Sequence, residues 1–228
     1  MKCKKSHIIL TVVCLWFAIP AIAQKSDTGN WFIYFGNQKI NKKWNWHNEL
    51  QYRNYNFIGD LNQLLLRTGI GYNLTENNNN ILLGYAFINT QKYLPNSKEK
   101  IGTNEHRIFQ QFITRQSFNK VFIQHRYRIE ERFFSNDFQM RFRYFLGINI
   151  PINKPRIEKN AYYLSAYNEI FMNAQNNIFD RNRLYGAIGY VINKNIRIEA
   201  GYMAQTLEVN NRNQFQIVIF NSIPLLNN

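Results

Sequence analysis

Cysteine is nearly absent from this 228-residue chain, and no long hydrophobic run occurs after its first 23 residues. Both cysteines, Cys3 and Cys14, lie in that first segment, so the remainder has no thiol for a disulfide or a cysteine-ligated metal site. Polar or charged residues interrupt every later apolar run, so we expect no transmembrane helix there. If the remainder spans a membrane, a closed β-barrel is the structure left, because lipid does not tolerate open sheet edges.

Acidic residues are also scarce: 14 Asp and Glu stand against 28 Lys and Arg, which gives a net charge of +14. A basic balance raises nucleic acid as a partner. Here, however, the arginines are spread through many segments at alternate positions, without an exposed basic helix or a Gly-rich aromatic RNA motif. We therefore expect no nucleic-acid partner. A cationic interior, or a surface that meets anionic lipopolysaccharide, explains the charge more simply.

The first 23 residues have the pattern of a secretory signal peptide. A basic leader with Lys2, Lys4 and Lys5 precedes the apolar run 8–19, and Ala21-Ile22-Ala23 is a small-x-small cleavage pattern. We expect cleavage before Gln24. A membrane anchor is the alternative, although the run is shorter than the roughly 20 residues that span a bilayer. The sequence thus predicts a signal peptide at 1–23 and a barrel domain at 24–228.

The clearest structural pattern lies between Val121 and Pro151. Two alternating segments flank a predicted turn at Ser135, Asn136 and Asp137, and each has one apolar and one polar parity. Successive strand residues point to opposite faces, so this hairpin has one apolar face and one ionised face. The alternation lasts about 13 residues per strand, whereas strands of globular proteins average roughly 5 to 6. This length favours a membrane barrel over a soluble sandwich.

The same alternation recurs along the chain and predicts a transmembrane antiparallel meander β-barrel of about ten to twelve strands. An even strand number is usual for such barrels, so the eleven segments found imply either that Trp31–Ile40 is not a full strand or that a twelfth was missed. The segments are Trp31–Ile40, Trp44–Tyr55, Leu61–Leu74, Ile81–Tyr93, Glu105–Ser117, Val121–Phe133, Phe138–Pro151, Tyr162–Met172, Arg181–Ile192, Ile196–Glu208 and Gln214–Phe220.

The connections and the aromatic content suggest where such a barrel lies. Asn-Lys turns begin at Asn41, Asn119, Asn153 and Asn193, while the other connections are more varied and include a longer predicted loop at Leu94–Thr103. Short periplasmic turns and longer outer loops are typical of outer-membrane barrels, as are girdles of aromatic residues; this chain has 18 Phe, 14 Tyr and 4 Trp. We expect an outer-membrane location in a Gram-negative bacterium, in contact with membrane lipid and lipopolysaccharide. A soluble periplasmic β-barrel binding protein is the alternative.

A series of short motifs follows in a fixed order along the chain. The motifs are Glu49-x-x-x-Arg53, Leu66-Arg67-x-Gly69, Gly84-Tyr85, Glu105-His106-Arg107, His125-Arg126-x-Arg128-x-Glu130-x-Arg132-Phe133, Arg141-x-Arg143-Tyr144, Asn168-Glu169 and Arg183-Leu184-Tyr185-Gly186. In this order they resemble an uncharacterised outer-membrane family common in Bacteroidota, a domain of unknown function, over most of the range from Gln24 to Leu225. The resemblance implies an outer-membrane barrel and supplies no activity, ligand or catalytic residue.

The candidate functional site is the polar parity itself. A barrel of eight to ten strands has an interior barely wider than its side chains, so these residues are expected to form an ion-pair network. One interpretation is a structural plug, because charges away from water must be paired. The other is a narrow anion-preferring pore or pocket, since arginine binds carboxylate and phosphate in a bidentate manner. The residues are Arg53, Arg67, Glu105, Arg107, Arg126, Arg128, Glu130, Arg132, Arg141, Arg143, Glu169 and Arg183.

Other function classes have weaker support. A lipid-modifying enzyme needs a serine nucleophile with a histidine base, and no motif joins His47, His106 or His125 to a serine. His125 lies on the apolar parity, which suits an interfacial residue better than a base. The histidines have no metal-ligand spacing, so neither a metal nor another cofactor is expected. Adhesion through asparagine-rich loops such as Asn173–Asp180 is a further alternative.

Overall fold

A computed structural model describes residues 28–75, 78–175, 177–208 and 211–226. The predicted signal peptide and its cleavage site before Gln24 lie outside these residues. Within them, no helix is long and apolar enough to cross a membrane.

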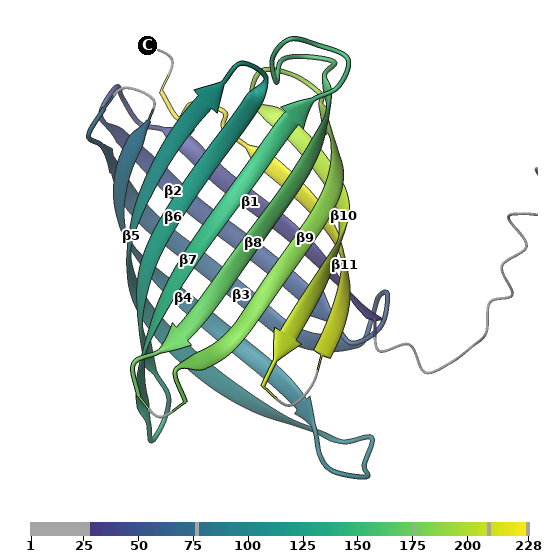
Figure 1. The fold of residues 1–228 in the computed structure, drawn as a ribbon. Helices are drawn as coiled ribbons and strands as arrows, with labels where there is room; N and C mark the ends of the chain where they lie inside the picture. The colour runs from purple at the N-terminus through teal and green to yellow at the C-terminus, as the bar shows by residue number, and fades with distance from the viewer. Residues whose placement is uncertain (1–27, 76–77, 176, 209–210, 227–228) are drawn as a thin grey trace, which may run out of the picture.

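The described residues form an all-β closed barrel of eleven strands (Figure 1). The strands follow one another around the barrel in chain order, and β11 then pairs with β1. They are β1 (Thr28–Lys39), β2 (Trp44–Asn54), β3 (Leu61–Asn73), β4 (Asn79–Tyr93), β5 (Lys100–Phe118), β6 (Val121–Phe133), β7 (Phe138–Pro151), β8 (Tyr162–Asn173), β9 (Phe179–Val191), β10 (Ile196–Leu207) and β11 (Asn211–Asn221).

The two faces of the barrel wall follow the alternation expected from the sequence. On β7, Phe142 is 38% exposed on the outside, whereas Arg143 is only 6% exposed. On β6, Tyr127 is 49% exposed and the next residue, Arg128, is 3% exposed. The apolar parity therefore faces outward and the guanidinium-bearing parity faces the interior.

The closure of the barrel differs from the expected antiparallel meander. Ten neighbouring pairs are antiparallel, but β1 and β11 pair in parallel, from Thr28 opposite Asn213 to Gly36 opposite Asn221. The sequence predicted either that the first segment is not a full strand or that a twelfth strand exists. Both predictions are wrong for the described residues, because β1 is a full strand and no twelfth strand is present. With an odd number, the first and last strands of a meander run in the same direction and have to close in parallel.

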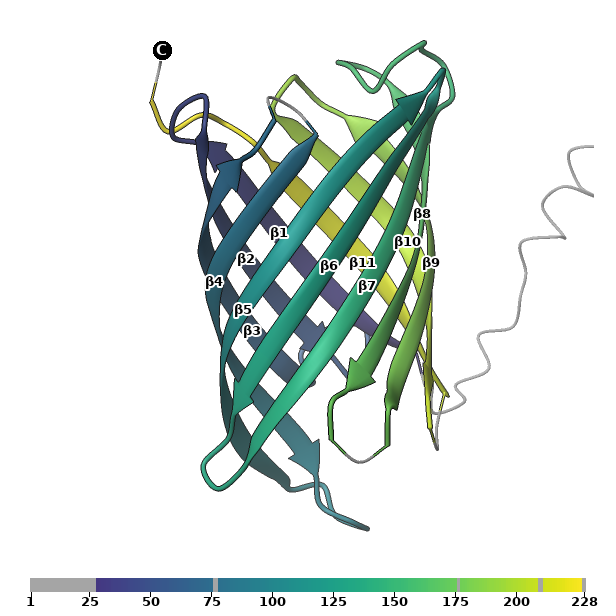
Figure 2. The same cartoon turned by 60° about the vertical axis from the view of Figure 1, so that its left-hand side comes forward.

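Several predicted boundaries also need correction. The predicted loop Leu94–Thr103 is shorter, because β5 begins at Lys100 and not at Glu105, while β4 ends at Tyr93 as predicted. The β4–β5 hairpin projects beyond the neighbouring hairpins (Figure 2). The longest connection is 152–161, at the opposite end, so connection length does not separate the two ends as expected. The four Asn-Lys turns do lie at one end, together with the end of β11; we call it the C-terminal end (Figure 1).

The interior also contains apolar side chains between the charged ones. One cluster consists of Leu65, Leu82, Ala86, Ile88 and Phe109, from β3, β4 and β5. A second lies on the opposite wall around Trp31, Ile33, Tyr185, Met203 and Val218.

One interior tyrosine packs over a glycine of the neighbouring strand. The Tyr163 ring lies across Gly189, where an added Cβ would come within 2.1 Å of the ring carbon Cζ. The Tyr163 hydroxyl donates a hydrogen bond of 2.8 Å to Glu199. Glycine at this position leaves room for the ring to lie over β9, so that its hydroxyl reaches β10.

Candidate functional site

The register of the strands places opposite charges next to each other across the wall. Glu49 on β2 lies opposite Arg67 on β3, and Glu130 on β6 lies opposite Arg141 on β7. In both pairs the arginine donates hydrogen bonds to the carboxylate. Cross-strand partners point to the same side of the sheet, so these ion pairs follow directly from the register.

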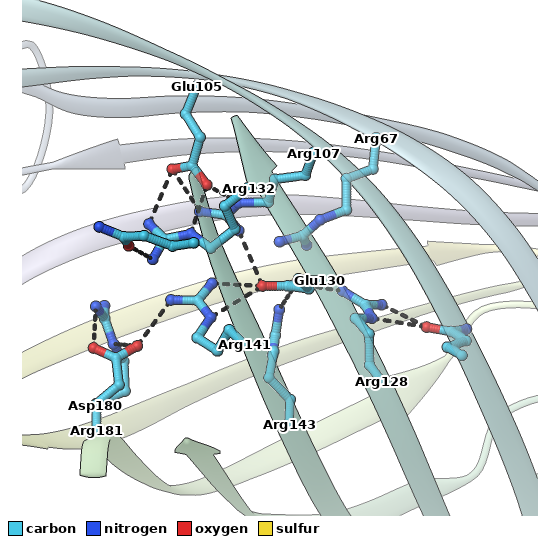
Figure 3. A network of polar contacts seen from close by, with 12 residues as sticks. Arg67, Glu105, Arg107, Arg128, Glu130, Arg132, Arg141, Arg143, Asp180 and Arg181 are labelled. Atoms are coloured by element: carbon cyan, nitrogen blue, oxygen red, sulfur yellow. Dashed lines mark hydrogen bonds and ion pairs between the residues drawn. The ribbon is translucent and has the colours of Figure 1, made fainter. Parts of the chain in front are cut away.

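Two other register pairs join like charges, and each is bridged by a carboxylate. Arg107 lies opposite Arg132, and Glu105 accepts hydrogen bonds from both. Arg128 lies opposite Arg143. Their bridge is Glu130, which lies 3.5 Å from Nη1 of Arg128 and accepts a hydrogen bond from Arg143 (Figure 3). The acids thus offset arginine–arginine repulsion.

Glu169 on β8 is shared in a similar way. It accepts hydrogen bonds of 2.7 Å from Nη2 of both Arg126 and Arg143, and Nη1 of Arg183 lies 3.8 Å from its other oxygen. Three arginines from β6, β7 and β9 therefore converge on one carboxylate.

The structure places all twelve residues predicted from the sequence on the interior parity. Ten are buried, and the side chains of Arg126 and Arg132 are 16% and 13% exposed. Eleven of them contact the carboxylates Glu49, Glu105, Glu130 or Glu169, or are themselves among these acids. Arg53 is different: it donates to Gln51 and Gln63, and its guanidinium carbon lies 3.8 Å from the centre of the Trp31 ring.

Asp180 and Arg181 belong to the network although the sequence pattern did not include them. Arg141 donates a 2.8 Å hydrogen bond to Asp180, which also accepts from Arg181. Asp180 was predicted to end the loop Asn173–Asp180 and Arg181 to begin the next strand, whereas β9 begins at Phe179 and includes both residues. Arg115 was also missed, although its parity matches that of Arg107 and predicts an inward side chain.

A cavity of about 510 Å³ occupies the half of the barrel toward the C-terminal end. Its lining includes Arg67, Arg128, Arg143 and Glu169, so the ion-pair network forms its floor. Glu105, Arg107, Glu130, Arg132 and Arg141 do not line it, and they lie on the interior face toward the other end of the barrel.

The charged groups around this cavity are unbalanced. Among the described residues, nine cationic side chains line it against three acids. Two of the acids, Glu49 and Glu169, are engaged by arginines, and Glu199 accepts from Tyr163. The cavity therefore has a surplus of positive charge. The cations are Arg53, Arg67, Arg115, Arg126, Arg128, Arg143, Arg183, Lys194 and Arg197.

The histidines do not form a catalytic arrangement in the described part of the chain. His125 lies on the outer face, where its Nδ1 is 2.9 Å from the hydroxyl oxygen of Tyr144, and His106 contacts Tyr85 in the same manner. His47 points inward, with its Nε2 3.5 Å from Glu49. None of the three hydrogen bonds to a serine, and no group of three or more potential metal-ligating side chains is found among the described residues.

Comparison with known families places the chain in a family whose role is unknown. The model of the DUF2490 family, described as a protein of unknown function, matches residues 28–216. The chain belongs to this family. No curated protein and no solved structure matches it. The DUF2490 match covers almost the whole barrel, including every residue of the Arg/Glu network, and supplies no activity or ligand for it.

Proposed function

We propose that this DUF2490 protein is an outer-membrane barrel whose interior forms a blind pocket for a small anion. The observation that carries the proposal is the cavity lined by nine cations and three acids. Arginine recognises carboxylate and phosphate groups through paired N–H donors, and a water-restricted site strengthens that attraction. The network beneath the cavity has a structural role, because its charges are buried and paired.

The outer surface supports a membrane location. Large apolar side chains are exposed over most of the strands, including Leu66 on β3, Leu83 on β4 and Ile188 on β9, which are 42%, 60% and 60% exposed. Exposed apolar patches on soluble monomers rarely exceed a few hundred Å². An apolar outer wall around a charged interior is what lipid requires of a barrel.

The proposed orientation follows from the C-terminal end. If the last strand runs inward, the Asn-Lys turns and the mouth of the cavity face the periplasm. The ligand then enters from the periplasm, and outer-membrane lipid and lipopolysaccharide surround the wall.

Planar-bilayer recording distinguishes the blind pocket from an anion-preferring pore. The purified full-length mature protein should give no conductance in either direction, because the buried ion pairs of Glu130 with Arg107 and Arg141 occupy the interior beyond the cavity. A steady current with an anion-selective reversal potential would instead show that the lumen is open.

Anion binding is tested by the thermal unfolding midpoint of the protein in lipid nanodiscs. Citrate should raise the midpoint in a saturable manner, compared with sodium chloride of equal ionic strength, because a ligand that binds only the folded state stabilises it. The double variant Arg115→Gln/Arg197→Gln should lose most of this response. If no organic anion raises the midpoint of the wild type, the pocket proposal fails.

A further inference from the structure

The cations near the mouth of the cavity differ from those at its floor. Arg115 donates its Nε–H to Gln124 at 3.0 Å, and the guanidinium carbon of Arg197 lies 4.1 Å from the centre of the Phe220 ring. Neither arginine, nor Lys194, forms an ion pair with a described carboxylate, whereas Arg67 and Arg143 at the floor do. Arg115 on β5 and Arg197 on β10 both line the cavity. The place for an incoming anion is therefore between these mouth cations.

The walls below the mouth are aromatic. The Phe145 ring lies 5.0 Å from the Tyr167 ring, and Tyr167 in turn stacks on Tyr185 at 4.7 Å. On the wall formed by β1 and β11, Phe35 stacks on Phe220 at 5.4 Å. All five rings line the cavity.

Aliphatic side chains fill the gaps between the rings, and one floor arginine also faces an aromatic ring. Ile113 and Val218 line the cavity beside the aromatic residues. The guanidinium carbon of Arg126 lies 4.6 Å from the centre of the Phe145 ring. Such walls offer an apolar contact surface directly beneath a cationic mouth. This arrangement suits a molecule that has both an apolar part and an anionic group.

The size of the cavity points the same way. The cavity volume of about 510 Å³ lies in the range of roughly 300 to 1,000 Å³ that is typical of pockets for drug-sized molecules. It far exceeds the volume of one inorganic ion. An ion such as sulfate would satisfy the mouth arginines and leave the aromatic walls without contact.

The turns around the mouth add a long-range field. Lys39, Lys42, Lys43, Lys120, Lys154, Arg156, Lys159 and Lys194 lie at this end, and Glu158 is the acid found there among the described residues. A rim of one sign raises the local concentration of oppositely charged ligands and their rate of entry.

Resting on the proposed function, we propose that the ligand is an amphipathic organic anion. It has one carboxylate, phosphate or sulfonate group, held between Arg115 and Arg197, and a compact aromatic or branched apolar body. The body packs against Phe145, Tyr167 and Phe220, and the basic rim draws the molecule in from the C-terminal end.

Calorimetric titration of the mature protein in nanodiscs with three probes tests this inference. Naphthalene-2-sulfonate should bind at least about tenfold more tightly than sodium sulfate, and 1-naphthylmethylammonium should not bind, since burial of the ring and charge pairing both contribute. Empty nanodiscs give the contribution of partition into lipid.

Two variants separate the head of the ligand from its body. Arg115→Gln/Arg197→Gln should lower the affinity for naphthalene-2-sulfonate by about tenfold or more. Val218→Phe narrows the cavity without a change of charge. It should lower the affinity for naphthalene-2-sulfonate and leave the affinity for sulfate unchanged. Lys42→Gln/Lys43→Gln, on the rim outside the cavity, is the matched charge control and should reduce affinity less than the arginine pair. Heat-modifiable gel mobility checks that each variant is folded.

Each remaining outcome counts against one of the two proposals. Equal affinity for sulfate and naphthalene-2-sulfonate would overturn the proposal of an amphipathic ligand. It would leave the proposal of an anion pocket intact. Binding of neither anion would overturn the anion pocket itself. Binding that equals that of empty nanodiscs, or that the arginine and Val218 variants leave unchanged, would show that the probe dissolves in lipid and would overturn the inference.

Discussion

Glu130 is the residue on which the interior network depends most. It is fully buried and forms ion pairs with Arg107, Arg128, Arg141 and Arg143, which come from β5, β6 and β7. Removal of one member of a buried ion pair leaves its partner charged and desolvated. At Glu130 that cost falls on four arginines at once.

We expect Glu130→Gln to destabilise the folded barrel by about 3 to 5 kcal/mol, the usual cost of breaking a buried ion pair. Urea-induced unfolding in lipid vesicles, followed by tryptophan fluorescence, measures the change. Glu131→Gln is the matched control, because the neighbouring Glu131 faces outward and accepts a 3.3 Å hydrogen bond from Gln110. The control should lie within about 0.5 kcal/mol of the wild type. Equal effects of the two substitutions would contradict the network described here.

The sequence was a good guide to the site at the residue scale. Alternation alone placed Arg128, Arg143 and ten further residues on the interior face, because a strand leaves each side chain only two directions. It did not reveal which carboxylate each arginine contacts, since that depends on strand register. The aromatic walls around Phe145 and Tyr167 were also missed, because an aromatic residue at an inward position looks in the sequence like a break in the polar parity.

At the scale of elements, the β1–β11 seam is the feature that the sequence did not predict. Alternation sets the faces of a strand but not the direction of a partner almost the whole chain away. Expectation based on even strand numbers then pointed to ten or twelve strands. The parallel ladder from Thr28 to Gly36 settles the number at eleven for the described residues.

A disulfide across the seam tests this closure. Phe32 lies opposite Ile217, and both are on the outward parity. In a protein without its native Cys3 and Cys14, Phe32→Cys/Ile217→Cys should cross-link under mild oxidation and shift the band on a non-reducing gel. Phe32→Cys/Gln216→Cys puts the two thiols on opposite faces and should not. Cross-linking of the control alone would mean that the register is displaced by one residue.

The projecting β4–β5 hairpin is held by a small polar cluster at the end of the barrel opposite the C-terminal end. Lys100 donates to Asp60, and the Tyr93 hydroxyl lies 2.9 Å from both oxygens of that carboxylate. The Lys100 ammonium also lies over the Tyr55 ring, as does the Arg212 guanidinium. Burial alone would lower the pKa of Lys100, but the hydrogen bond and the charge of Asp60 raise it overall. The hydrogen bond to Asp60 also raises the pKa of Tyr93.

Both shifts predict that alkaline pH releases this hairpin. A raised pKa means that the protonated group stabilises the folded cluster, and this stabilisation is lost as pH rises through the pKa of the folded state. Proteinase K should therefore cleave 94–99 slowly at pH 8 and faster above about pH 10.5, beyond the ordinary pKa of lysine. Asp60→Asn should already be cleaved quickly at pH 8. A cleavage rate in the wild type that does not change over this range would contradict the assignment.

At the scale of the whole molecule, the barrel reverses the arrangement of a soluble protein. Its charged network is inside, and large apolar side chains such as Leu184 and Ile188 are 61% and 60% exposed outside. The sequence indicated this reversal through the length of its alternating segments. It could not show how much of the interior is filled, because the volume left over depends on how arginines, rings and glycines such as Gly189 pack together.

The most direct test of the account is whether the outer wall faces lipid. In a cysteine-free background, Ile188→Cys is labelled with an environment-sensitive fluorophore and placed in vesicles that contain brominated lipid. Lys42→Cys, on a turn at the C-terminal end, is the control. We expect blue-shifted emission that brominated lipid quenches at position 188, and neither effect at position 42. Water-like, unquenched emission at position 188 would show that the apolar wall faces solvent, and would contradict the account.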